Sequence, residues 1–243
     1  MSDDGYPPQE TRPAGAMAGV GASVRRIPVT WIVGIANVAG LLFTEASGGS
    51  LKPAVMIRAG AMARPLLEQG ELWRMLTSGF LHFGAIHLLA NMWGLYIFGP
   101  VLERMVGSVR FAGLYVASLL AGSAAAAFTT PANAVSAGAS GAIFGLLGAI
   151  GVVGFRWRHT PLGRAWVRQA AVIVGLNVLI GLTDPTIGLS AHLGGLVGGA
   201  AVMAVETRGG PRRELEVARP WAGFSAAVIL STGSVLAVAL WLR

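Results

Sequence analysis

The stretch GASGAIFGLLGAIGVVGF, residues 138–155, carries no charged residue and has the apolar character of a helix buried in a membrane protein. It follows a break rich in small and polar residues, TTPANAVSAGAS (129–140), and it opens with a serine between glycines. Glycines at positions 141, 145 and 148 let a second helix approach closely. Ser140 is therefore either a small residue that allows close helix packing or a nucleophile, and the rest of the sequence is needed to distinguish these two roles.

The composition places the chain in the membrane class. Of 243 residues, 54% are hydrophobic and only 12% are charged, about half the charge of a soluble domain. The chain has no cysteine, which excludes disulfides, thiolate metal sites and a cysteine nucleophile. No cluster of metal-ligating residues is visible, so the sequence predicts neither a metal nor a cofactor.

Seven apolar segments recur along the chain, each long enough or nearly long enough to cross a bilayer. They cover residues 27–46, 85–103, 110–128, 140–155, 166–182, 190–206 and 221–242. We expect an all-α polytopic fold with a core of six helices over 27–206, a long interfacial connection over 47–84, and an additional C-terminal membrane helix over 221–243. Residues 1–26 are polar and are expected to be disordered, and 207–220 form a charged connector.

The basic residues indicate an orientation. With the N-terminus inside, thirteen of the 18 Lys and Arg residues fall on the cytoplasmic side, and four of the remaining five lie in the long first connection. The net charge of +7 is accordingly interpreted as a topology signal beside anionic lipid, not as a nucleic-acid site. The Arg-rich, Ala- and Gly-rich composition favours a bacterial source, hence a bacterial plasma membrane with a cytoplasmic N-terminus and with Ser140 near the outer face.

Few polar residues interrupt the apolar segments, and each needs a reason because burying such groups in hydrocarbon is costly. His87 and Asn91 lie four residues apart, on one helix face. His192 opens the sixth segment, and Glu103 ends the second, where it is expected to meet water. Alone, each histidine is more often a hydrogen-bonded interfacial residue than a functional one. We interpret Asp184, followed by a proline, as part of a turn instead of a third catalytic group.

The combination favours catalysis. Glycines 195 and 199 form a small-residue stripe that can bring the sixth helix against the fourth, with Ser140 and His192 at the same depth. A serine within hydrogen-bond reach of a histidine is an activated nucleophile. The start of the fourth helix offers free backbone N–H groups, and His87 and Asn91 add side-chain donors for an oxyanion.

The same residues resemble a known family, the rhomboid intramembrane serine proteases. The resemblance rests on Trp73 and Arg74, on HFGAIHLLANM (82–92) and ERMVG (103–107), on GASG (138–141), and on AHLGGLVGG (191–199). These motifs span residues 73–199 in the order that the family shows.

The resemblance implies roles for individual residues. Ser140 would be the nucleophile and His192 the general base of a dyad, and His87, Asn91 and the Ser140 backbone N–H would line the oxyanion hole. Support for the site would come from Gly138, Gly141, Phe144 packed against the histidine, Gly195, Gly199, Trp73 and Arg74. Trp73 and Arg74 would brace the first connection, with Glu103 or nearby backbone as partner.

The implied activity is hydrolysis of peptide bonds in or near the membrane helices of single-span proteins, with no nucleic-acid partner and with the oligomeric state left open. An alternative is a catalytically silent relative that binds membrane helices for quality control. A small transporter that uses His87 and His192 as a proton relay is a third interpretation, but no internal repeat supports it.

Overall fold

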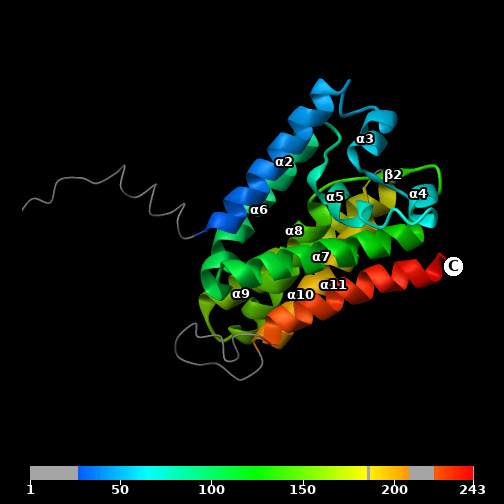
Figure 1. Ribbon diagram of the computed structural model, residues 1–243. Helices are drawn as coiled ribbons and strands as arrows, with labels where there is room; N and C mark the ends of the chain where they lie inside the picture. The colour runs from blue at the N-terminus through cyan, green and yellow to red at the C-terminus, as the bar shows by residue number, and fades with distance from the viewer. Residues whose placement is uncertain (1–26, 185–186, 208–221, 243) are drawn as a thin grey trace, which may run out of the picture.

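The computed structural model describes residues 27–184, 187–207 and 222–242, and these are almost entirely helical (Figure 1). The long helices are α2 (Pro28–Ala46), α6 (Gly84–Val106), α7 (Ser108–Thr129), α8 (Ser140–Arg156), α9 (Pro161–Thr183), α10 (Leu189–Glu206) and α11 (Ala222–Trp241). All but α8 are long and apolar enough to cross a membrane, and α8 is an apolar helix of 17 residues. The predicted all-α polytopic fold is therefore confirmed.

The predicted segment boundaries agree with these helices to within a few residues, with one exception. Helix α9 begins at Pro161, five residues before the predicted start, because Thr160 caps it and accepts a hydrogen bond from the Gly163 N–H at 3.0 Å. The predicted disordered N-terminus and nearly all of the charged connector lie outside the described residues. The division into a core, a connector and an added helix stays a prediction.

Helix α8 lies at the centre of the bundle and packs against α6, α7, α9 and α10. Its buried side includes Leu146 and Leu147, which belong to the same hydrophobic core as Phe111 and Tyr115 of α7. Figure 1 shows α7, α10 and α11 running side by side, while α2 and α6 pack against each other as a separate pair. The first residue of α8, Ser140, is thus surrounded by the other helices at one end of the bundle.

The long first connection is folded and covers that same end of the bundle (Figure 1). It contains α3 (Pro53–Ala59), β1 (Met62–Ala63), α4 (Arg64–Glu68), α5 (Arg74–Thr77) and the 3₁₀ turn η1 (Ser78–Phe80). Strand β1 pairs antiparallel with β2 (Val135–Ser136), Met62 opposite Ser136 and Ala63 opposite Val135. Because β2 precedes Ser140 by only a few residues, this pairing ties the connection to the entrance of α8.

Candidate active site

The chain reaches Ser140 through a tight glycine turn after β2. Gly138 has φ +139°, a backbone conformation that residues with a side chain rarely adopt, and its N–H donates to the Ser78 carbonyl at 2.9 Å. A Cβ on Gly138 would lie 2.8 Å from Cε1 of His87, so the imidazole of that residue occupies the space a side chain would need. Glycine at 138 therefore lets the chain pass directly beside His87 and turn into α8 at Ser140.

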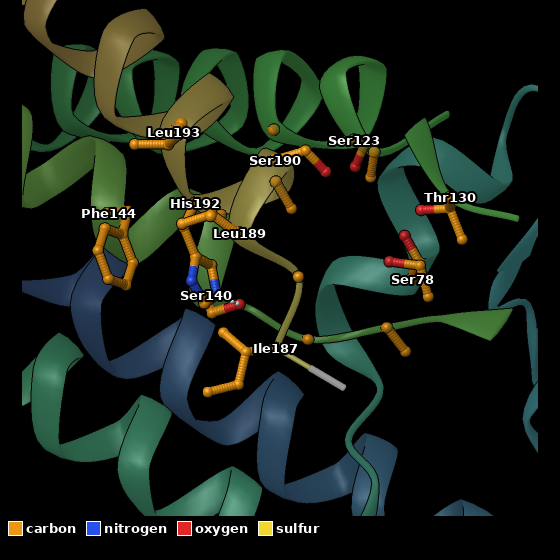
Figure 2. A pocket seen from close by; sticks show the side chains of 18 of the residues that line it. Ser78, Ser123, Thr130, Ser140, Phe144, Ile187, Leu189, Ser190, His192 and Leu193 are labelled. Atoms are coloured by element: carbon orange, nitrogen blue, oxygen red, sulfur yellow. Dashed lines mark hydrogen bonds between the residues drawn. The ribbon is translucent and has the colours of Figure 1, made fainter. Parts of the chain in front are cut away.

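The structure brings Ser140 and His192 together although they are 52 residues apart. Nε2 of His192 lies 2.8 Å from Oγ of Ser140, as Figure 2 shows. His192 stands near the start of α10 and is only 8% exposed.

Close contact between α8 and α10 produces this meeting. A Cβ on Gly195 would overlap the carbonyl oxygen of Gly141, and one on Gly199 would overlap the carbonyl oxygen of Gly145. The two helices therefore touch backbone to backbone along this stripe, an approach that only glycine permits. The stripe sets the register that puts the first turns of the two helices at the same depth.

Two further contacts hold the imidazole of His192. Phe144, one turn after Ser140, stacks on it with ring centroids 4.3 Å apart and an angle of 3° between the planes. Its Nδ1 lies 3.0 Å from Oδ1 of Asn177 on α9, a residue that the sequence analysis missed. Since the amide oxygen is an acceptor, Nδ1–H donates to it, and Nε2 is left to accept the Ser140 hydroxyl proton. A polar residue in the middle of an apolar segment was the available signal for Asn177.

His87 and Asn91 line the same cavity from α6. Nδ2 of Asn91 donates to the His87 carbonyl at 2.8 Å, and since an amide nitrogen carries two hydrogens, one donor remains. The His87 ring lies against Gly138, within reach of the turn that carries Ser140.

A third histidine of the site, His82, was missed by the sequence analysis, as Asn177 was. It is fully buried just before α6, and its ring meets the His87 ring edge-on with centroids 5.1 Å apart. Burial, with a smaller contribution from His87, lowers the pKa of His82 to about 3, so the ring is neutral. The Ala139 N–H points at its Nε2 over 3.5 Å, which supports the turn before Ser140.

The cavity around these residues has a volume of about 1160 Å³ and lies at the end of the bundle where α8 and α10 begin. Figure 2 shows the hydroxyls of Ser78, Ser123 and Ser190 around it beside the apolar Ile187 and Leu189. These hydroxyls can hydrogen-bond water at a site between membrane helices. Across residues 27–184, 187–207 and 222–242, no three His, Asp or Glu side chains gather in a way that could hold a metal ion.

Arg74 braces the first connection, but not through Glu103. Its guanidinium pairs with Glu71 at 2.7 Å, donates to the carbonyls of Ile57 and Ala61, and lies 4.5 Å over the Trp73 ring. Trp73 itself is half exposed. The backbone partners match the expectation, whereas the suggested contact with Glu103 is wrong.

Glu103 does not meet water, so that expectation is also wrong. It is 1% exposed, and its carboxylate accepts hydrogen bonds from the backbone N–H groups of Val29 and Thr30, from the Thr30 hydroxyl and from Ser108. The first N–H groups of a helix have no acceptor within it, and Glu103 supplies one for α2. This carboxylate therefore fastens α2 to the junction of α6 and α7.

Fold and site together define a class: a polytopic helical membrane protein with a serine–histidine contact in a cavity at one end of the bundle. Comparison with known proteins places the chain within it, since residues 69–209 match the family model of the Rhomboid domain. The chain belongs to the rhomboid family.

Several relatives share this region. The chain is 41% identical over 155 residues to Rhomboid protease GluP of Bacillus subtilis; the matched region covers 64% of this chain and 30% of that protein. It is 39% identical over 144 residues to RHOMBOID-like protein 5 of Arabidopsis thaliana, covering 58% and 46%. Identity to Rhomboid-like protease 1 of Toxoplasma gondii is 32% over 207 residues, covering 83% and 68%. The chain thus spans less than half the length of the first two of these relatives.

Proposed function

We propose that this protein is an intramembrane serine endopeptidase that uses Ser140 and His192 as a catalytic dyad. The observation that carries the proposal is the 2.8 Å contact between Oγ and Nε2 inside a cavity at one end of the bundle. Membership in the rhomboid family and the protease names of two of its relatives support the reaction class.

The geometry suits a two-step acyl transfer. Oγ of Ser140 attacks the scissile carbonyl carbon while its proton passes to Nε2 of His192, and the histidine then protonates the leaving amine. Water deprotonated by the same nitrogen hydrolyses the acyl-enzyme ester and regenerates the serine. Asn177 keeps Nδ1 protonated and Phe144 keeps the ring plane fixed, so the base points at the hydroxyl throughout.

Three donors can stabilise the oxyanion that forms on the substrate carbonyl. The Ser140 N–H lies in the first turn of α8, where the helix supplies no acceptor and its dipole favours negative charge. Asn91 has one amide hydrogen left after its bond to the His87 carbonyl. The His87 ring lies beside the glycine turn and faces the same cavity.

The substrates we propose are single-span membrane proteins, cleaved near one end of their membrane helix. A scissile peptide has to leave helical geometry to reach Ser140, and Gly or Pro near the cleavage point lowers that cost. A lone membrane helix can unwind at its end without breaking a packed core. Helix-weakening residues beside the cleavage point should therefore raise the rate.

The distribution of the basic residues supports a cytoplasmic N-terminus, which would put the cavity near the outer face, and the Arg-, Ala- and Gly-rich composition supports a bacterial plasma membrane. The absence of cysteine gives a direct test, since single cysteines can be introduced into an unreactive background. The substitution Ala132→Cys, in the loop before β2, should give a protein that reacts with a membrane-impermeant maleimide added to intact cells. Cysteine at His159, between α8 and α9, should react only after lysis, and the reverse pattern would overturn the orientation.

The activity is tested by reconstituting the full chain in liposomes with a single-span substrate and following cleavage by gel and mass spectrometry. We expect wild type to cleave, and Ser140→Ala and His192→Ala to lose at least about a thousandfold in rate. Full cleavage by Ser140→Ala would refute the dyad. Binding without cleavage by well-folded wild type would instead support the silent, helix-binding alternative.

A further inference from the structure

A second cleft, of about 740 Å³, lies at the opposite end of the bundle from Ser140, between α8, α9 and α10. Helix α9 packs on α8 but scarcely touches α10, which leaves a gap between the two whose floor is α8. Small residues line it from all three helices, among them Gly151, Ala170 and Ala200. The cleft is therefore an open groove between neighbouring membrane helices.

The groove is apolar along its length and cationic at one end. Leu147, Val174 and Leu196 form its walls, and the polar side chains among its lining residues are those of Arg156 and Arg158. Both arginines stand where α8 ends, close to the membrane surface. An apolar slot that ends at two positive charges has the polarity of a lipid molecule, with a tail at one end and a charged group at the other.

The two arginines are held in place and still have donors to offer. Arg156 donates to the Ala204 carbonyl at 3.4 Å, while Arg158 donates to the Phe155 carbonyl at 2.9 Å and lies 4.5 Å over the Phe155 ring. Each guanidinium carries five N–H donors, so several remain. Within the described parts of the chain, neither arginine forms a salt bridge with a carboxylate.

We propose that this groove binds an anionic phospholipid, with one acyl chain between α9 and α10 and the phosphate held by Arg156 and Arg158. An acyl chain brings no hydrogen-bonding group into the apolar slot, whereas an extended peptide segment would bury unsatisfied backbone groups there. The arginines match a phosphate in charge and in geometry. This site is independent of the proposed proteolysis, so catalytically inactive Ser140→Ala protein can be used to measure it.

The test is a titration of the detergent-solubilised full chain with dioleoyl phosphatidylglycerol, monitored by native mass spectrometry, with dioleoyl phosphatidylcholine as the neutral comparison. We expect the anionic lipid to bind at least about tenfold more tightly. Arg156→Gln combined with Arg158→Gln should weaken its binding about twenty-five-fold, at about fivefold for each arginine. The matched control, Arg104→Gln with Arg168→Gln, removes the same charge from the same end without touching the groove, and should change binding less than twofold.

A second variant tests the apolar part separately. A Cβ on Gly151 would meet only the Ala170 Cβ, at an ordinary van der Waals distance of 3.7 Å. In Gly151→Leu the Cβ is therefore accommodated, and the rest of the leucine side chain fills the groove. We expect it to lose lipid binding with both arginines present, while gel filtration shows folded protein. Equal affinity for the two lipids, equal losses in the control pair, undiminished binding by Gly151→Leu, or displacement by soluble glycerol phosphate would each overturn the proposal.

Discussion

Substituting Asn177 gives the most specific test of the contacts that hold the His192 imidazole. Its Oδ1 accepts a hydrogen bond from Nδ1 of His192 at 3.0 Å, and the ring is otherwise fixed by Phe144 and Ser140. Asn177→Leu keeps the size of the side chain and removes the acceptor, which leaves a largely buried N–H unpaired. Such a loss costs about 1–3 kcal/mol, and about 2 kcal/mol corresponds to a rate reduced about thirtyfold.

Cleavage of a single-span substrate in liposomes measures this effect. We expect Asn177→Leu to lower kcat with KM unchanged within about twofold, since the hydrogen bond orients the base and contributes little to substrate binding. Asn177→Asp retains an acceptor oxygen at the same position and should restore most of the rate. Leu176→Ala, on the lipid-facing neighbour in α9, is the matched control and should behave like wild type.

The reasoning is refuted if folded Asn177→Leu keeps its full kcat, since the hydrogen bond would then play no part in holding the base. It is equally refuted if Asn177→Asp loses as much as Asn177→Leu, because a side chain of the same shape that keeps the acceptor oxygen would then fail to hold the base.

Three further substitutions, one of them with a matched control, test the scaffold. Glu103→Ala deletes a buried carboxylate that accepts four hydrogen bonds, and should lower the free energy of unfolding by about 3 kcal/mol in a denaturing-detergent titration; an unchanged midpoint would contradict its role at α2. Gly199→Val should abolish folding by overlapping the Gly145 backbone, while Gly175→Val, with open space around it, should remain monodisperse in gel filtration. Arg74→Lys keeps the charge but loses the forked geometry, and should cost about 1 kcal/mol, seen as a lower Tm; an equal or higher Tm would count against the bracing contacts.

The sequence predicted the helices well because hydropathy is a local property that the bilayer enforces. It also predicted which helix heads meet, since the glycines at 195 and 199 indicate close packing wherever they face another small-residue stripe. Gly141 and Gly145 supply that stripe on α8. The packing of α10 against α8 could thus be inferred from glycines that recur at a helical spacing on both segments.

Contacts that depend on the tertiary arrangement were not predictable in this way. Glu103 looked like the charged end of a membrane segment, and only the position of α2 shows that its carboxylate caps another helix. Asn177 lies on α9, whose sequence gives no packing stripe that would orient it toward His192. Backbone partners were expected for Arg74, but no sequence pattern indicates that they are the carbonyls of Ile57 in α3 and of Ala61 just after it.

Labelling with a fluorophosphonate, followed by mass spectrometry to locate the adduct, tests the central claim most directly. The reagent reacts with serines that a neighbouring base has activated, so it examines the Ser140–His192 contact without any assumption about substrate. We predict an adduct on Ser140 of wild type, none in Ser140→Ala, and labelling slowed at least about a hundredfold in His192→Ala. Folded protein that stays unlabelled, or Ser140 labelling that persists unchanged without His192, would contradict the account.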